Sequence, residues 1–151
     1  MGTRSRIGYV NENGEIVSAY CHWDGYPSYN GKILLENYTT LAKVKKLVDQ
    51  GDMSSLGEKC TKPKDHSFEN PKTGYTIYYH RDRGEDAKKT KAITSRNIKE
   101  YVKTAEKSWG EYAYLFQDGK WVFSETGTIN IRDLTPADCG PIVLTTDINI
   151  K

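Results

Sequence analysis

The sequence predicts an α+β domain: an antiparallel sheet built from two β-hairpins plus additional strands, with two amphipathic helices packed on one face. Asn13-Gly14 and Asp118-Gly119 are dipeptides that tolerate positive φ, and they are typical of two-residue hairpin turns. Apolar residues recur at helical spacing in two other stretches. Strands and helices do not alternate regularly, which argues against a doubly wound parallel sheet.

The first hairpin is expected from Arg6 to Trp23. With Asn13-Gly14 as its turn, Val10 faces Val17 across the two strands. Successive strand residues point to opposite faces, so the second strand has one apolar face for the core and one polar face for chemistry. The core face carries Val17, Ala19, Cys21 and Trp23, and the other face carries Ile16, Ser18, Tyr20, His22 and Asp24.

Asp24-Gly25-Tyr26-Pro27 is predicted to be a turn, in which Gly25 supplies a positive φ and Pro27 forces Tyr26 into an extended conformation. A short helix is expected over residues 32–38. Thr39 or Thr40 caps a second helix that ends at Gly51. The apolar stripe of this second helix consists of Leu41, Val44, Leu47 and Val48, and its lysines lie mainly on the solvated side.

The clearest helix begins at Thr94 or Ser95 and ends at Gly110. Its stripe consists of Ile98, Tyr101, Val102, Ala105 and Trp109. The second hairpin follows over residues 111–125, with Asp118-Gly119 as its turn. That register predicts an aromatic ladder, with Phe116 opposite Trp121 and Tyr114 opposite Phe123.

A long loop is expected over residues 52–74, followed by a strand over residues 75–80. The tail from residue 126 has an alternating stretch over 128–131, a helix start at Thr135-Pro136 and an apolar stretch over 142–144. One or two further strands are predicted there. The whole chain, 1–151, is read as a single domain, with residues 129–151 as a C-terminal extension.

The charge balance, the cysteines and the lack of long apolar runs limit the classes of function that the protein can have. The chain has 22 basic and 20 acidic residues, and this near balance argues against sequence-specific nucleic-acid binding. Three cysteines without metal-site spacing suggest reduced thiols in an intracellular setting. No apolar run is long enough to span a bilayer, so no membrane partner is expected. Neither a metal nor a cofactor is predicted.

His22 and Asp24 lie two residues apart on one strand face. One interpretation is an acid–base pair for catalysis or metal binding. The alternative, favoured about two to one, is that both side chains stabilise the following turn by hydrogen bonds. Cys21 cannot use His22 as its base, because adjacent strand residues point to opposite faces.

Arg81-Asp82-Arg83-Gly84-Glu85 directly follows the predicted 75–80 strand. Two arginines at a strand end can form a fork that binds a phosphate or carboxylate, and a self-paired charge run is the equal alternative. We expect this segment to lie beside the end of the first hairpin and to form one pocket rim with it. The candidate ligand-binding residues are His22, Trp23, Asp24, Tyr26, Asn30, Arg81, Arg83 and Glu85.

Several strings resemble a family of short, mostly uncharacterised proteins encoded by tailed bacteriophages and prophages. They are Gly8-Tyr9-Val10, Tyr20-Cys21-His22-Trp23-Asp24-Gly25-Tyr26-Pro27 with Asn30-Gly31, Arg81-Asp82-Arg83-Gly84-Glu85, and Tyr112-Ala113-Tyr114-Leu115-Phe116 with Gly119-Lys120-Trp121. The resemblance runs from about Ile7 to Phe123. It implies an accessory role during infection of a bacterial cell and names no reaction.

Three functions are compatible with these observations. The first is a non-enzymatic binder in the host cytoplasm that counters antiviral defence, by sequestering a small anionic, nucleotide-like ligand or by blocking a host defence protein. The second is a small hydrolase or nucleotide-modifying enzyme with His22 as general base and Asp24 nearby. The third is a virion or host interaction module that docks through exposed tyrosines. A homo-oligomer is compatible with each of them.

Overall fold

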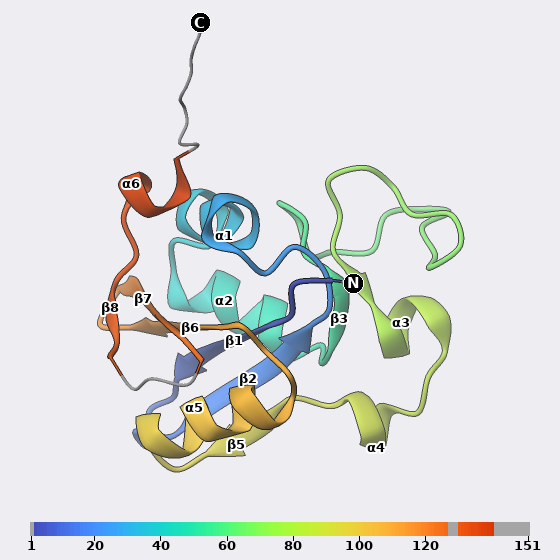
Figure 1. Cartoon of the computed structure of the whole chain (residues 1–151). Coiled ribbons are helices and arrows are strands. Elements are labelled where there is room, and N and C mark those ends of the chain that lie inside the picture. Colours follow the sequence, from blue (N-terminus) through green and yellow to red (C-terminus); the bar gives the residue numbers. More distant parts are fainter. Residues whose placement is uncertain (1, 127–129, 141–151) are drawn as a thin grey trace, which may run out of the picture.

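The computed structural model describes residues 2–126 and 130–140 and consists of one twisted sheet with helices on both faces (Figure 1). The strand order is β4-β3-β2-β1-β6-β7-β8, and β5 also pairs with β2. The strands are β1 (Ser5–Val10), β2 (Ile16–Cys21), β3 (Met53–Ser55), β4 (Ile77–Tyr78), β5 (Ile93–Ser95), β6 (Tyr112–Gln117), β7 (Lys120–Glu125) and β8 (Arg132–Asp133). The predicted α+β class is confirmed.

The centre of the sheet is a parallel pair. β1 runs parallel to β6, with Ile7 opposite Tyr114, and β2 runs parallel to β3. The other ladders are antiparallel, so the sheet is mostly antiparallel, as predicted, but contains two parallel pairings. A parallel neighbour needs a crossover, and the chain from residue 22 to residue 111 supplies it. Sequence pattern alone gave no sign of this pairing.

The first hairpin forms with a different register from the predicted one, because Val10 pairs with Ile16 instead of Val17. The Asn11 side chain accepts hydrogen bonds from the amides of Asn13 and Glu15, both at 2.9 Å, and organises a longer loop. Only Gly14 has a positive φ there, at +80°. The alternation along β2 is unaffected, so Ala19 and Cys21 are buried in the core as predicted.

The second hairpin agrees with its prediction in every pair. Phe116 lies opposite Trp121, and Tyr114 lies opposite Phe123. Asp118 and Gly119 have φ values of +52° and +78°, as a type I′ turn requires. The Phe116 and Trp121 rings meet edge to face at 5.3 Å between centroids. The indole of Trp121 also donates to the Tyr38 carbonyl at 2.9 Å, which fixes the end of a helix against this ladder.

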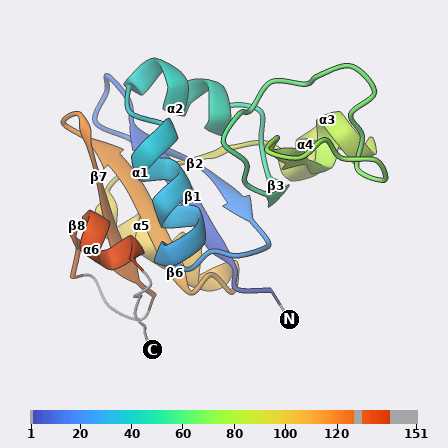
Figure 2. The ribbon, with the colours of Figure 1, turned by 90° about the horizontal axis from the view of Figure 1, so that it is seen from above.

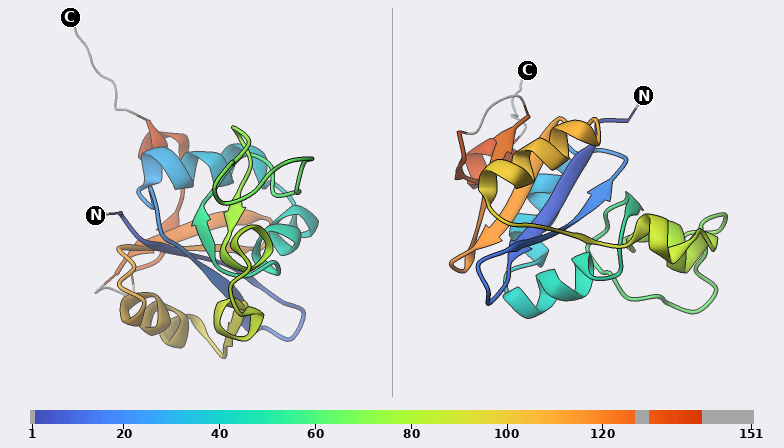
Figure 3. Two further views of the ribbon diagram at one scale, coloured as in Figure 1. Left: turned by 90° about the vertical axis from the view of Figure 1, so that its right-hand side faces the viewer. Right: turned by 90° about the horizontal axis from the view of Figure 1, so that it is seen from below.

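The helices do not share one face of the sheet, which corrects the prediction. One core cluster contains Val44, Leu47 and Val48 of α2 (Leu41–Val48) together with Leu34 of α1 (Lys32–Asn37). The cluster on the other face contains Tyr101 and Ala105 of α5 (Ile98–Lys107). Figure 2 shows α1 and α2 over one face, and the right-hand view of Figure 3 shows α5 across the opposite face. The strands are apolar on both sides, so each face needs a cover.

Most helix ends follow the expected capping chemistry. The Thr40 side chain accepts from the Lys43 amide at the start of α2, and Gly51 after it has a φ of +95°. The start of α5 differs: Asn97 is its N-cap, and the expected Ser95 lies in strand β5. Trp109, expected on the buried stripe, follows the helix with a φ of +61° and is 78% exposed.

The middle of the chain contains more regular structure than predicted. The expected loop from residue 52 includes β3, and the expected 75–80 strand is only the two-residue β4. Residues Tyr79–Arg83 form the short helix α3, which ends at Gly84 with a φ of +82°. Another short helix, α4 (Ala87–Thr90), follows. Arg81 and Arg83 therefore lie on a helical turn instead of leaving a strand end.

The C-terminal part is described up to Gly140. Pro136 begins the short helix α6 (Pro136–Cys139) with a capping box between Thr135 and Asp138, as the Thr135-Pro136 signal predicts. The strand β8 lies just after the alternating stretch predicted at 128–131, whose first two residues fall outside the described ones. The apolar stretch 142–144 also lies outside the described residues.

Tyr101 links α5 to the parallel strand pair, and its removal tests this packing. Its hydroxyl lies 2.6 Å from the Tyr114 carbonyl and 3.0 Å from the Arg6 carbonyl, and the side chain is fully buried. Tyr101→Phe should lower the free energy of unfolding by about 1–2 kcal/mol, because a buried carbonyl loses its donor. Urea unfolding measures this, with Tyr112→Phe at a half-buried position as the control. Equal losses in the two variants would contradict the assignment.

Candidate functional site

The loop after β2 folds back against the N-terminal segment. Asp24, and not Gly25 as predicted, has the positive φ, at +57°. Gly25 is needed for space instead, because a Cβ there would lie 2.8 Å from the Thr3 carbonyl oxygen and 2.7 Å from the Ser5 Cβ. Tyr26 is extended before Pro27, as predicted, and Pro27 opens a single π-helical turn, η1 (Pro27–Gly31).

His22 and Asp24 do not hydrogen-bond to each other in this loop. The Tyr20 hydroxyl lies 2.7 Å from His22 Nδ1, and the Tyr26 hydroxyl donates to Asp24 Oδ1 at 3.0 Å. Each of the two side chains thus has a tyrosine partner within the same segment. Burial and the neighbouring Arg4 lower the pKa of His22, which favours a neutral ring. This geometry agrees with the structural interpretation of the two residues.

Three aromatic side chains of this loop reach solvent, and we call Trp23, Tyr26 and Tyr29 the aromatic loop surface. Their exposed fractions are 42%, 37% and 41%. Trp23 was expected in the core, but it lies beyond the last residue of β2. Asn30, expected to contact a ligand, is fully buried, and its amide nitrogen lies 3.3 Å from the Trp23 carbonyl oxygen. Asn30 therefore stabilises the loop through a buried hydrogen bond to its backbone.

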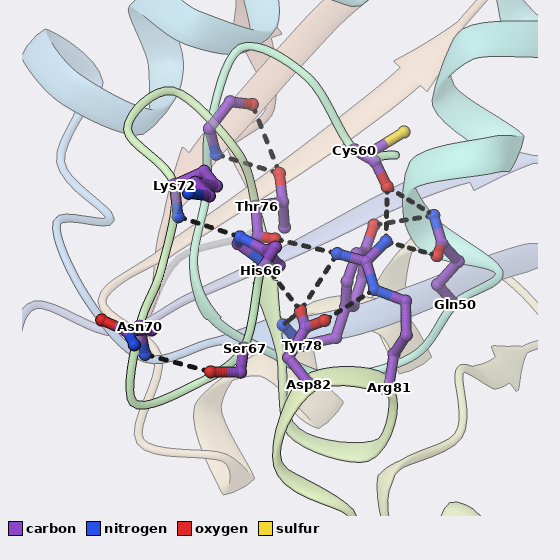
Figure 4. A network of polar contacts seen from close by, with 11 residues as sticks. Gln50, Cys60, His66, Ser67, Asn70, Lys72, Thr76, Tyr78, Arg81 and Asp82 are labelled. Carbon is purple, nitrogen blue, oxygen red and sulfur yellow. Dashed lines mark hydrogen bonds and ion pairs between the residues drawn. The ribbon is translucent and has the colours of Figure 1, made fainter. Parts of the chain in front are cut away.

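Arg81 points into the protein, where it joins several separate segments (Figure 4). Its guanidinium forms a two-pronged pair with Asp82, with Nε to Oδ1 at 2.9 Å and Nη2 to Oδ2 at 3.0 Å. The same group also donates to Gln50 Oε1 and to the backbone carbonyls of Cys60 and Thr76. The guanidinium thereby ties the end of α2, the 60–61 segment and β4 together.

His66 is a member of this network that the sequence did not reveal. Its side chain is fully buried, with Nε2 lying 3.4 Å from Asp82 Oδ2. The Lys72 amide donates to Nδ1 at 3.0 Å, so Nε2 is the ring nitrogen that faces the carboxylate. An isolated histidine in a polar stretch carries no spacing signal. Only the folded loop brings it to Asp82.

Arg83 and Glu85 remain at the surface. Arg83 Nη1 lies 3.5 Å from Glu85 Oε2, and the guanidinium stacks on Phe68 at 4.6 Å from its ring centroid.

β3 lies between the end of β2 and β4 in the sheet. The loop after the first hairpin and the Arg81–Glu85 segment, which were expected to form one pocket rim, border different cavities. Ser28 and Tyr29 line one cavity, and Arg81 lines another. The self-paired alternative thus describes the observed contacts of both arginines.

A different part of the surface collects unpaired positive charge. We call it the lysine cavity; it has a volume of about 460 Å³. Lys43 and Lys46 come from α2 and Lys59 from the segment after β3, and within the described chain none of the three forms an ion pair. Its lining consists of Asn37, Tyr38, Lys43, Lys46, Glu58, Lys59, Cys60 and Thr61.

The lining of the lysine cavity is ordered by local hydrogen bonds. The Tyr38 hydroxyl donates to the Gly57 carbonyl at 2.8 Å, and Gln50 Nε2 donates to the Cys60 carbonyl at 3.0 Å. Burial raises the pKa of the Cys60 thiol, although Lys46 and Arg81 oppose the shift. The helical pattern of the sequence predicted that the lysines of α2 lie mainly on a solvated face. Lys43 and Lys46 are three residues apart, a spacing that makes them neighbours on the surface of α2.

The chain matches no protein-family model, no curated protein and no solved structure. In the part of the chain that the structure describes, no three His, Cys, Asp or Glu side chains gather closely enough to hold a metal ion. Within the same described residues, every helix is too short or too polar to cross a bilayer.

The two arginines should respond differently to truncation. Arg81→Ala leaves the fully buried Asp82 carboxylate without its ion pair, which should cost about 3 kcal/mol of unfolding free energy. Arg83→Ala removes an exposed pair and should cost less than about 1 kcal/mol. Denaturant unfolding of both variants separates the roles. A similar small loss in both would show that the Arg81 network contributes little.

Asp82 should also make stability depend on pH. Burial opposes its ionisation, but hydrogen bonds from Arg81 and from the Tyr78 amide outweigh burial and lower the pKa of the carboxyl below 3.8. The stabilisation is then complete above about pH 4 and is lost as the pH falls through the lowered value. The difference in unfolding free energy between wild type and Asp82→Asn should shrink on acidification. A difference that stays constant from pH 7 to pH 2.5 would refute this linkage.

Proposed function

We propose that the protein is a non-enzymatic binder of a small anionic ligand, which it holds in the lysine cavity. The observation that carries this proposal is the convergence of three lysines without ion-pair partners among the described residues around a cavity of about 460 Å³. Cavities that bind small molecules commonly measure about 300–1,000 Å³. The lining has three lysines against one carboxylate, that of Glu58, together with one amide and apolar surface, and this excess of positive charge suits a compact phosphate-bearing or carboxylate-bearing molecule.

The location differs from the one predicted from sequence, while the ligand class stays the same. Arg81 was expected to bind the anion directly. Its guanidinium instead holds the Cys60 carbonyl, and Cys60 lines the lysine cavity. Arg81 therefore fixes the position of the cavity wall without contacting the ligand, and Lys43, Lys46 and Lys59 contact the ligand. A buried arginine suits this role because its planar fork can bind several fixed acceptors at once.

The resemblance to phage proteins extends the proposal to a biological setting. A phage-encoded binder of a small anion would act in the host cytoplasm and counter antiviral defence by lowering the free concentration of an anionic signal. Sequestration needs affinity and no turnover. The tyrosine partners of His22 and Asp24 suit such a binder better than the alternative hydrolase, which requires the two residues to work as a pair.

A second candidate function is docking to a host protein, and the aromatic loop surface favours it. Trp23, Tyr26 and Tyr29 reach solvent within seven residues of chain, next to the Asp24 carboxylate. Tyrosine and tryptophan are enriched where proteins meet, because they bury a large area with few rotatable bonds. In this version the protein blocks a defence protein directly, and Trp23→Ala would abolish the inhibition while leaving anion binding unchanged.

The lysine cavity makes a direct prediction about anion affinity. Inorganic pyrophosphate should bind the wild-type protein, and Lys43→Ala/Lys46→Ala should weaken binding by about tenfold or more, given roughly 1 kcal/mol per exposed charge contact. Isothermal titration calorimetry at low salt measures this, since salt screens exposed charges.

The matched control removes the same charge from the opposite face of the sheet. Lys103→Ala/Lys107→Ala on α5 should leave the affinity for pyrophosphate unchanged, because both side chains are exposed away from the cavity. Recovering intact ligand after incubation supports binding without turnover. Equal weakening by both double variants, or no binding by the wild type, would refute the proposal.

A further inference from the structure

The lysine cavity adjoins a second cavity of about 430 Å³, and Asn37 and Glu58 line both. We call these two neighbouring cavities along α1 the groove. One wall consists of η1, α1 and the start of α2, and the other consists of the segments around residues 57–61 and 73–74. The lining of the second cavity consists of Ser28, Tyr29, Lys32, Ile33, Glu36, Asn37, Gly57, Glu58, Thr73 and Gly74.

The two ends of this groove differ in chemistry. The lysine end is lined by three lysines and the single carboxylate of Glu58. The Lys59 ammonium lies over the Tyr75 ring, 5.6 Å from its centroid. The lining of the other end includes Tyr29 and Ile33 together with both signs of charge, from Lys32, Glu36 and Glu58. Tyr29 is 41% exposed, and its ring meets Tyr26 edge to face at 6.4 Å, so Tyr26 leaves part of the ring uncovered. The exposed part of the Tyr29 ring offers a stacking surface to a planar group.

Glu58 and Asn37 lie at the junction of the two cavities. Tyr29 lines one of the two cavities and Tyr38 lines the other, and Glu58 is part of both linings. A carboxylate at this point repels a phosphate but accepts hydrogen bonds from hydroxyl or amino groups. A ligand that fills the groove therefore has an anionic end, a hydroxyl-bearing middle and a planar end.

We infer that the ligand of this groove is a nucleoside di- or triphosphate, with its phosphates on the lysines, its sugar hydroxyls at Glu58 and Asn37, and its base on Tyr29. This inference rests on the proposed function and names its ligand class. Stacking on an aromatic ring tolerates any base, so the phosphates and the sugar supply the selection.

The test compares ADP with inorganic pyrophosphate on the intact chain. ADP should bind the wild-type protein about tenfold more tightly than pyrophosphate, the gain expected from one base stacked on an aromatic ring. Tyr29→Ala should remove this gain and leave pyrophosphate affinity unchanged, and Tyr29→Phe should retain it. Glu58→Gln removes a charge that repels phosphate and weakens the acceptor for the sugar hydroxyls, so it should reduce the advantage of ADP over pyrophosphate.

Tyr26→Ala is the matched control, since Tyr26 is an exposed aromatic neighbour that lines neither cavity. It should leave both affinities unchanged, with thermal unfolding confirming that each variant is folded. If pyrophosphate binds through the lysines but ADP binds no more tightly, or if Tyr29→Ala weakens both ligands equally, the nucleotide inference is wrong and the anion-binding proposal stands. If neither ligand binds, both are wrong.

Discussion

The parallel pairing of β1 with β6 buries the centre of the sheet on both faces, and the positions of all the longer helices follow from this constraint. A strand pair that is apolar on both sides needs two covers. α5 supplies one of them, which leaves α1 and α2 together on the other face. The groove lies along the outer side of this second cover, so the arrangement of the core decides where a ligand can bind.

The sheet edge beyond β2 sets the opposite wall of the groove. β5 occupies the first half of that edge, and β3 pairs only at Cys21. The chain leaves β3 at Ser55 and reaches β4 at Ile77, and the intervening segment extends beside α1 and α2. Its first part supplies Glu58, Lys59 and Cys60 to the cavity. A longer β3 would have placed these residues in the sheet and closed the site.

Features determined by neighbouring residues were predictable from the sequence. The Asp118-Gly119 turn, the Thr40 cap and the Thr135-Pro136 helix start depend on contacts within a few residues, and each was confirmed. The register of the first hairpin was wrong because the Asn11 side chain reorganises the turn. Asparagine competes for backbone groups in this way without any visible change in hydrophobic pattern.

Features determined by distant residues were not predictable. Amphipathic periodicity shows that α5 has a buried face but not which side of the sheet receives it. Likewise, Asn30 reads as a polar loop residue, although the fold buries it completely. The lysine cavity joins residues from α2 with residues more than ten positions further along the chain, and no spacing rule connects them. Arg81 was predicted to bind an anion or to pair with a nearby carboxylate, and its contacts with Gln50 and Cys60 exist only in the folded chain.

The Arg81 network has a consequence for binding kinetics. The guanidinium fixes the Cys60 carbonyl to the end of α2 and to β4, so one wall of the groove is already ordered before a ligand arrives. Association then avoids the entropic penalty of closing a loop, and preorganisation of this kind strengthens binding without adding contacts. A groove that is open and rigid also needs no slow conformational step, so capture can proceed at a rate close to that of diffusional encounter. In the proposed role the protein competes with a receptor for a scarce molecule, and that speed then matters as much as the final affinity.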